Sequence, residues 1–185
     1  MLVERSFYYL RHGETDWNKE RRMQGSTDIP LNATGVEQAH KAKEALRNCT
    51  VQTICCSPLS RAYDTAVIVN AVLRAKLVVV EKLTECSFGV LEGEIRGNWY
   101  QDWRNGMEMP EGVDVYGEFI ERALAGINES LSKEGPVLIV GHGGVYWAVQ
   151  EHGASDIEGN LPNAVPIHHE PPNSERRAWI TTLVG

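Results

Sequence analysis

The sequence predicts an α/β protein, a three-layer α/β/α sandwich around a mostly parallel sheet. Two observations lead to this fold class. Aliphatic runs without polar alternation, such as residues 77–80 and 137–140, are typical of strands that are buried on both faces. Stretches with helical periodicity separate these runs, and strands that alternate with helices favour a parallel sheet with helices on each side.

The first strand and helix are indicated by their end signals. An apolar run that glycine ends predicts a strand at residues 7–10. The tetrad Thr34-Gly35-Val36-Glu37 has the form of a capping box. We therefore expect a helix from about Gly35 to Arg47 with Thr34 as its N-cap.

The middle of the chain repeats this order. Residues 53–56 predict a second strand, and 77–80 a third. Ser57-Pro58 supplies an N-cap and a proline at the first helical position, which predicts a helix that runs to Leu73. Residues 137–140 predict a fourth strand.

The connection between the third and fourth strands is long and aromatic. It spans about residues 94–133 and ends in a helical pattern around Phe119 and Ile127. Long connections in small domains often form lids over sites, and extra helices that cover the sheet are an equal alternative. Four of its side chains are candidates to line a pocket under the lid, where they could stack on a ring of the substrate: Trp99, Tyr100, Trp103 and Arg104. Of these, Trp103 fits the core better.

The C-terminal part predicts one more strand, at residues 178–184. The adjacent pair His168-His169 is isolated from other metal-ligand types, so we expect surface or strand-edge residues and no metal site. No zinc-type spacing occurs among the four cysteines, which favours buried or bystander thiols. Cys55 and Cys56 are adjacent in a predicted strand and should point to opposite faces.

Composition bounds the class of protein. The 185 residues, 42% of them hydrophobic, are enough for one sizeable core, so we expect a single domain over residues 1–185 with a lid-like insertion at about 94–133. A net charge of −7 argues against nucleic-acid or acidic-membrane partners. The chain shows no signal-peptide pattern and no long apolar span, which predicts a cytoplasmic protein. Its oligomeric state stays open, and a homo-oligomer is compatible with the sequence.

Chemically active side chains follow four of the predicted strands. Ligands of open α/β sheets bind beyond the carboxyl ends of the strands. Two arginines, two histidines and one carboxylate occupy these positions: Arg11, Arg61, His12, His142 and Glu85. Each alone has an ordinary structural explanation, such as an ion pair between Arg61 and Asp64 or a capping role for Glu85. Their joint placement at one edge favours a site for phosphate or another small anion.

Phosphate chemistry would use these groups in a specific way. A histidine nitrogen can attack phosphorus and form a covalent intermediate. One carboxyl group, such as Glu85, can protonate the leaving alkoxide and then deprotonate water. The glycines of Gly141-His142-Gly143-Gly144 would let backbone approach the ligand closely. The residues alone do not establish the reaction.

Five motifs in order resemble those of the histidine phosphatase superfamily, also called the phosphoglycerate mutase-like family. They are Arg11-His12-Gly13-Glu14-Thr15 with Trp17-Asn18, Gln24-Gly25 with Asp28-Ile29-Pro30-Leu31, Ser57-Pro58-Leu59-Ser60-Arg61-Ala62, Leu83-Thr84-Glu85 with Phe88-Gly89 and Glu92-Gly93, and Val140-Gly141-His142-Gly143-Gly144. The resemblance implies a phosphoglycerate mutase-like fold. It also suggests a late strand at 163–165.

The resemblance implies a role for each matching residue. His12 would be the phosphorylated nucleophile, and Glu85 the general acid and base. Arg11, Arg61 and His142 would hold the phosphoryl oxygens, and Asn18 would donate to the same group. Further residues expected to contact the substrate are Gln24, Gly25, Ser26, Arg22, Gly143 and Trp99.

The implied activity is a phosphomonoesterase that acts on a small phosphorylated metabolite without metal or other cofactor. Glu85 and His142 are 57 positions apart (142 minus 85), a shorter interval than a mutase is expected to have. Three alternatives stay open: phosphoglycerate mutase activity, a non-catalytic phosphate-binding module, and thiol chemistry at Cys86. The substrate itself is undetermined. Candidates include phosphoglycerate, sugar phosphates, phosphoserine and ribazole phosphate.

Overall fold

A computed structural model describes the chain apart from residues 96, 98, 108, 156, 158 and 160 and the side chain of Tyr100. Three of these residues fall inside the predicted insertion at 94–133. The expectation that Tyr100 lines a lid pocket therefore lies outside the described side chains.

The described strands form one mostly parallel, six-stranded sheet, in the order β3-β2-β4-β1-β5-β6. The first four strands run parallel to one another. β5 pairs antiparallel with β1, and β6 pairs antiparallel with β5. Their bounds are β1 Phe7–Arg11, β2 Thr53–Cys56, β3 Lys76–Val79, β4 Val137–Gly141, β5 Ile167–Glu170 and β6 Ile180–Leu183. Because β1 lies beside β4, the two histidine motifs that follow these strands begin next to each other.

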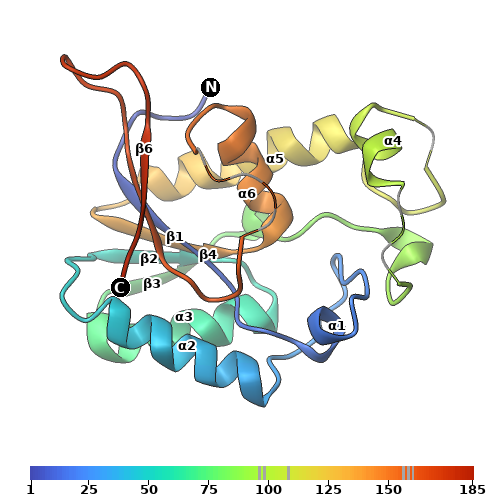
Figure 1. The fold of residues 1–185 in the computed structure, drawn as a ribbon, viewed down its shortest axis with the longest axis horizontal. Helices are drawn as coiled ribbons and strands as arrows, with labels where there is room; N and C mark the ends of the chain where they lie inside the picture. The colour runs from blue at the N-terminus through green and yellow to red at the C-terminus, as the bar shows by residue number, and fades with distance from the viewer. Residues whose placement is uncertain (96, 98, 108, 156, 158, 160) are drawn as a thin grey trace.

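Helices cover both faces of the sheet, and the predicted three-layer sandwich is confirmed (Figure 1). One layer holds α2 (Ala33–Ala45) and α3 (Ser60–Leu73), and the other holds α5 (Tyr116–Leu131) and α6 (Gly143–Glu151). The short elements are α1 Asp16–Lys19, α4 Tyr100–Arg104, η1 Glu81–Leu83 and η2 Gly89–Leu91.

The sheet separates two hydrophobic cores. Tyr9 and Ile139 belong to the core beneath α5 and α6, whereas Leu10 belongs to the core beneath α2 and α3. Cys55 and Cys56 divide in the same way, as their adjacent positions in a strand predict, and both thiols are buried and free. Burial of apolar surface on both sides of the sheet is the main stabilising contribution to this arrangement.

Two strand expectations are wrong. The valine-rich third strand is not buried on both faces, because β3 lies at the edge of the sheet, and Val79 is 44% exposed. Its composition resembles that of the central β4, so only the strand order distinguishes them. His168 and His169 lie in β5, inside the sheet, and His169 is completely buried and stacked on Phe7.

The helix caps also differ from the predicted ones. Asn32, not Thr34, is the N-cap of α2, because its side chain accepts a hydrogen bond from the Gly35 amide at 2.8 Å. The helix after β2 starts at Ser60 rather than at Pro58. Its first amide donates to Asp28, a residue 32 positions earlier, at 2.8 Å. A cap that comes from so far away in the chain carries no local sequence signal.

The suggested strand at 163–165 is a turn. Asn163 and Ala164 instead bind the backbone after β1. The Asn163 side chain donates to the carbonyl oxygen of His12 at 2.9 Å, and the Ala164 amide donates to that of Arg11 at 3.0 Å. These two bonds from the C-terminal part of the chain hold the segment that carries Arg11 and His12 in place.

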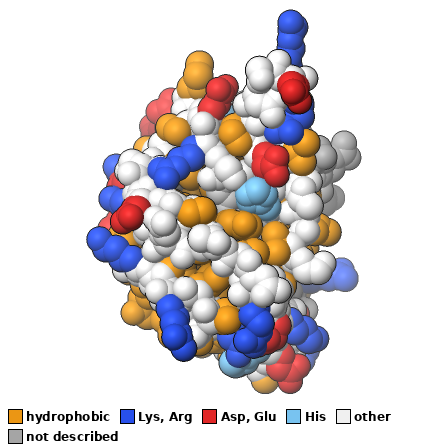
Figure 2. Space-filling view, turned by 90° about the vertical axis from the view of Figure 1, so that its left-hand side faces the viewer, with side chains coloured by type: hydrophobic (Ala, Val, Ile, Leu, Met, Phe, Trp, Pro, Cys, Tyr) orange, Lys and Arg blue, Asp and Glu red, His pale blue; other side chains and the backbone are white. Residues whose placement is uncertain are grey.

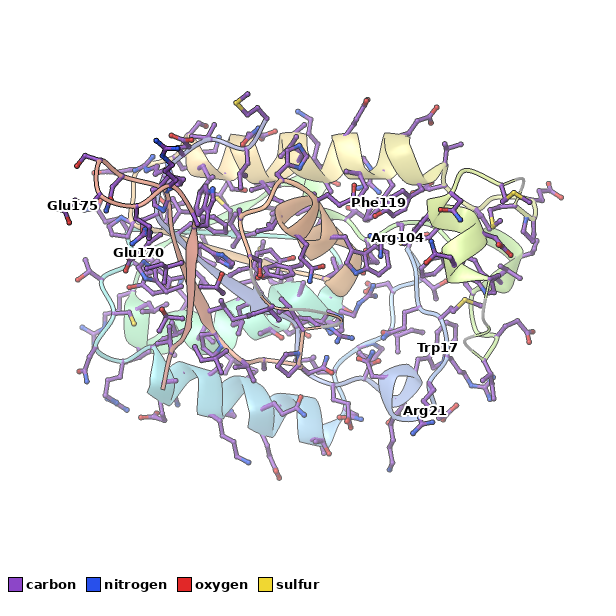
Figure 3. All side chains as sticks on the ribbon, turned by 45° about the horizontal axis from the view of Figure 1, so that its top comes forward. Trp17, Arg21, Arg104, Phe119, Glu170 and Glu175 are labelled. Carbon is purple, nitrogen blue, oxygen red and sulfur yellow. The ribbon has the colours of Figure 1, made fainter. Side chains whose placement is uncertain are left out.

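The long connection forms α4, α5 and an aromatic cluster. Trp103 is 1% exposed and packs against Phe88, Trp99, Tyr116 and Trp147, with ring centroids 5.0–5.9 Å apart. Trp103 therefore belongs to the core, as expected. Arg104, labelled in Figure 3, lies over the Tyr116 ring and pairs with Glu151 at 3.2 Å.

The two ends of the sandwich differ. Trp17, in α1, and Arg21, just after it, lie at one end of the molecule, and Glu170 and Glu175 lie at the other end (Figure 3). The surface near β6 mixes acidic, basic and hydrophobic side chains (Figure 2). In the part of the chain that the structure describes, no helix combines the length and apolarity needed to cross a membrane.

Close contact between α2 and the loop after β1 yields a stability prediction. A Cβ at Gly35 would overlap the carbonyl oxygen of Glu14, whereas a Cβ at Gly117 in α5 would meet open space. We expect Gly35→Ala to lower the free energy of unfolding by about 1–3 kcal/mol. Gly117→Ala should raise it by about 0.5–1 kcal/mol, since alanine favours the helix. Urea denaturation measures both, and a Gly35→Ala protein as stable as the wild type would contradict the argument.

Candidate active site

The strand ends bring the predicted residues around one cavity. Arg11 is the last residue of β1, and His12 follows it. Arg61 lies in the first turn of α3, and Glu85 follows η1. Parallel strands end at the same edge, which is why segments so distant in sequence meet here. The cavity is lined by Arg11, His12, Asn18, Arg22, Met23, Gln24, Gly25, Arg61, Glu85, Phe88, Gly143, Gly144 and Trp147.

Three expected residues lie outside this lining. His142 is completely buried beside the cavity, and its ring centroid is 5.2 Å from that of His12. Ser26 is exposed, and its hydroxyl and amide both donate to Glu92. Trp99 packs on Phe88 with ring centroids 5.5 Å apart.

Sequence inspection missed Met23, Phe88, Gly144 and Trp147 as lining residues. Gly144 and Phe88 belong to motifs that the sequence analysis identified. Gly144 adjoins Gly143 and Phe88 lies three residues after Glu85, so their place in these motifs was the available signal. Trp147 lies four residues after Gly143 on α6, which places it one helical turn further along the same face. This spacing would have indicated it if the helix had been predicted.

His12 has its tautomer set by the backbone. Its Nδ1 lies 2.7 Å from the carbonyl oxygen of Gly13, which can only accept, so Nδ1 carries the proton and Nε2 keeps its lone pair. The Gly13 amide in turn donates to Thr65 at 3.1 Å. Burial and the charges of Arg61 and Arg11 lower the pKa of His12 well below its ordinary value. The ring is therefore neutral at neutral pH and has a nitrogen available as a nucleophile.

His142 is held by a residue from another strand end. Its Nε2 lies 2.8 Å from the hydroxyl oxygen of Ser57, which follows β2. Its Nδ1 is buried and has no hydrogen-bond partner among the described residues. Burial lowers the pKa of His142 well below its ordinary value. The charges of Arg61, Arg11 and Arg122 and the nearby imidazole of His12 lower it further. Because His142 lies beside the cavity, an anion bound there is one group that could satisfy its Nδ1.

Arg61 is anchored by backbone oxygens. It is 1% exposed, and its two terminal nitrogens donate to the carbonyl oxygens of Gly25 and Thr27 at 2.7 and 2.8 Å. Its Nε is buried and, within the described residues, has no hydrogen-bond partner. Arg11 lines the same cavity and donates to the carbonyl oxygen of Leu161 at 2.5 Å. Two guanidinium groups so placed form a binding site for a doubly charged oxyanion.

Glu85 is oriented by two backbone amides. One carboxylate oxygen accepts from Gly144 at 2.9 Å, at the start of α6, and the other accepts from Cys86 at 3.0 Å. The side chain is half-buried and lines the same cavity as His12. A carboxyl group held in this way can exchange a proton with a ligand while its own position stays constant.

The turn that follows β1 determines the orientation of the Asn18 side chain. Thr15 is the N-cap of α1, and the oxygen of the Asn18 side chain accepts from the Thr15 amide at 3.2 Å. Thr15 also donates to Gln24 at 2.8 Å, which links this turn to the loop beneath Arg61. These contacts bring Asn18 and Gln24 to the same cavity wall.

Cys86 does not have the environment of a reactive thiol. It is completely buried, and burial followed by the nearby charge of Glu85 raises its pKa well above the ordinary value. A nucleophilic cysteine needs the opposite, a thiolate stabilised by positive charge. Within the described residues, no group of three or more histidine, cysteine, aspartate or glutamate side chains is placed to hold a metal ion.

The depressed histidine pKa values predict how stability depends on pH. In the unfolded chain His12 and His142 bind protons near pH 6.5, but in the folded protein only at lower pH. As the pH falls below about 6.5, stability should decrease by at most about 1.4 kcal/mol per pH unit for each histidine. Urea denaturation at pH 7.5, 6.5 and 5.5 measures this slope. The double variant His12→Asn/His142→Asn should have a shallower slope, and equal slopes would contradict the assignment.

Comparisons with known proteins agree with this geometry. The profile of the histidine phosphatase superfamily, branch 1, matches residues 7–168. The uncharacterized phosphatase PhoE of Bacillus subtilis (strain 168) is 38% identical over 156 residues, which cover 83% of this chain and 77% of PhoE. The probable phosphoglycerate mutase GpmB of Proteus mirabilis (strain HI4320) is 34% identical over 148 residues, 74% of this chain and 68% of GpmB.

A solved structure gives the same result for the fold. The structure of a mycobacterial glucosyl-3-phosphoglycerate phosphatase matches with a TM-score of 0.76 and 25% identity, and the match covers 97% of this chain and 98% of that one. The similarity extends over nearly the whole of both chains. It includes the strand ends that carry the cavity residues.

Proposed function

The chain belongs to the histidine phosphatase superfamily, and from this we propose that it hydrolyses small phosphomonoesters through a phosphohistidine intermediate on His12. The observation that carries the proposal is the state of His12. The Gly13 carbonyl holds its Nδ1 at 2.7 Å, and two arginines line the same cavity, so a neutral nucleophile stands beside an oxyanion site. This combination serves phosphoryl transfer and has little use in a purely structural cluster.

The first chemical step forms the intermediate. Nε2 of His12 attacks phosphorus, the N–P bond forms and the bond from phosphorus to the ester oxygen breaks. Glu85, in its protonated form, gives its proton to the departing alkoxide. Arg11, Arg61 and His142 stabilise the charge on the phosphoryl oxygens, which is the dominant contribution expected in phosphoryl transfer.

The second step releases phosphate. The Glu85 carboxylate takes a proton from water, the water oxygen attacks phosphorus, and the N–P bond to His12 breaks. The electron pair of that bond returns to Nε2, so the imidazole is neutral again. Inorganic phosphate leaves, and Glu85 is protonated as it was at the start. Arg22 and Ser26 are exposed, and Arg22 lines the rim, so water can reach this side of the cavity.

The identity of the leaving group is a separate question. Arg22, Met23, Phe88 and Trp147 also line the cavity, in addition to the residues that would hold the phosphoryl group. They offer one cation and three apolar surfaces, which suits a small metabolite with both polar and apolar parts. A panel of metabolite phosphates, scored by the release of inorganic phosphate, tests the proposal. No turnover on any member would contradict it, and binding without turnover would indicate a non-catalytic phosphate-binding module.

Mutase activity is the second candidate, because the relative from Proteus mirabilis is named a probable phosphoglycerate mutase. A mutase must return the phosphoryl group to the substrate before water intercepts it. Conversion of 3-phosphoglycerate to its isomer, dependent on a bisphosphoglycerate, would identify this activity. Release of inorganic phosphate without isomerisation would identify the phosphatase.

A further inference from the structure

Arg61 depends on a short loop for its orientation. The carbonyl oxygens of Gly25 and Thr27 accept hydrogen bonds from its two terminal nitrogens at 2.7 and 2.8 Å, respectively. Two such bonds fix both the position and the plane of a guanidinium group. They also leave the buried Nε without a partner among the described residues, where a phosphoryl oxygen can satisfy it. The position of residues 25–27 therefore determines where Arg61 can bind a ligand.

A single carboxylate holds that loop. Glu92 follows η2, and one of its oxygens accepts from the amide and hydroxyl of Ser26 at 2.9 and 3.1 Å. The other oxygen accepts from the amide of Thr27 at 2.9 Å and from its hydroxyl. The Phe88 amide, from the segment that follows Glu85, also donates to Glu92 at 3.0 Å. Glu92 thus joins the loop beneath Arg61 to the segment beside the proposed general acid.

The surroundings of Glu92 require an ionised acceptor. All five donors are N–H or O–H groups, and a carboxylate can accept every one of them, whereas an amide cannot. Burial raises the pKa of Glu92, but hydrogen bonds from Thr27, Phe88 and Ser26 outweigh it and keep the pKa below its ordinary value. A Cβ at residue 25 would overlap this carboxylate, and Gly25 has a φ of +54°, so glycine is needed there for both reasons.

We propose that Glu92 is a positioning residue, which sets Arg61 for phosphoryl binding through the loop of residues 25–27. It touches neither the substrate nor the reacting atoms, and it does not line the cavity. The proposal rests on the proposed function for its link to catalysis, but its first consequence is the affinity for phosphate. Neither the family profile nor the named relatives assign this role to Glu92.

Glu92→Gln tests the proposal. It preserves the size of the side chain but replaces one acceptor oxygen with an NH2 group, which would face the N–H and O–H donors of the loop. The matched control is Glu94→Gln, an exposed position two residues away with the same change in charge. Calorimetry measures the dissociation constant for inorganic phosphate, and thermal denaturation checks the fold. We expect Glu92→Gln to weaken phosphate binding and to lower kcat/KM by about 10- to 100-fold, since small displacements of a binding group have effects of this size. Glu94→Gln should leave both unchanged.

A double-mutant cycle separates positioning from general stability. If Glu92 acts through Arg61, Glu92→Gln should have no further effect on phosphate affinity in an Arg61→Gln background. An equal loss in that background, or a lowered Tm with unchanged phosphate affinity, would overturn the proposal. Should Glu92→Gln fail to fold, Thr27→Val removes only one donor and should cause a smaller loss that also vanishes with Arg61→Gln.

The proposed function and this inference fail in different ways. A wild-type protein that binds phosphate but hydrolyses no ester contradicts the function, while the affinity cycle still decides the role of Glu92. An active wild type whose Glu92→Gln variant keeps full affinity and activity contradicts only the inference. A wild type that binds no phosphate overturns both.

Discussion

His12→Asn should abolish phosphatase activity, with a loss of at least about 10⁴-fold in kcat, because the nucleophilic nitrogen is removed. Asparagine can still donate to the Gly13 carbonyl that Nδ1 binds at 2.7 Å, so the loop should keep its conformation. It has no counterpart of the Nε2 lone pair. The burial of His12 and the cationic cavity should remain, and inorganic phosphate should still bind.

A trapping experiment tests this expectation directly. The wild type is mixed with a phosphomonoester labelled in its phosphoryl group and quenched in alkali, where phosphohistidine survives. We expect labelled protein from the wild type and none from His12→Asn. His40→Gln is the matched control, since His40 is exposed on α2 and does not line the cavity. A label that persists in His12→Asn would place the nucleophile elsewhere.

Glu85→Gln should have the second largest effect, and the size of the effect should depend on the leaving group. For an alkyl phosphate, loss of the proton donor should lower kcat by about 10²- to 10⁴-fold. A nitrophenyl phosphate has a leaving group that needs no proton, so the first step should remain fast. Water attack then loses its base, and the phosphoenzyme should accumulate.

Rapid mixing with nitrophenyl phosphate makes this visible. We expect Glu85→Gln to release a burst of nitrophenolate equal to the enzyme concentration, followed by a slow steady state. Glu81→Gln is the control, because Glu81 is an exposed carboxylate on η1, just before the same loop. Equal losses for alkyl and nitrophenyl esters, without a burst, would assign Glu85 a structural role at the Gly144 and Cys86 amides.

The segment that carries Glu85, the proposed general acid, also depends on residues of the long connection. Arg122 of α5 donates to the carbonyl oxygens of Thr84 and Glu85 at 2.7 and 3.3 Å, and it pairs with Asp114 at 3.4 Å. Asp114 in turn accepts from the Ser87 amide at 2.9 Å. Residues 94–133 therefore do more than cover the sheet, because they also support the segment that carries Glu85.

Local patterns were sufficient for most of the secondary structure. The strands β1, β2 and β4 and the helices α2, α3 and α5 follow from apolar runs and helical periods, which are properties of a few neighbouring residues. Two errors arose where distant residues decide the outcome. Asp28 caps α3 from another loop, and β3 is half-exposed because it lies at the edge of the sheet that the described strands form. The cap of α2 is a local error, because Asn32 and Thr34 are two nearby residues that can both serve as an N-cap. The short helices α1 and α4 offered too few residues for a periodic signal.

The sequence by itself determined which chemical groups the protein contains and the order in which they follow the strands. Motifs around His12, Arg61, Glu85 and His142 carry that information, since residue type and spacing are local properties. Only the tertiary structure decided which atoms face one another: the Gly13 carbonyl at Nδ1 of His12, Ser57 beside His142, and the loop that Glu92 holds beneath Arg61. Hydrogen bonds act over about 3 Å, and the sequence alone does not specify which distant segments the folded sheet brings within that range.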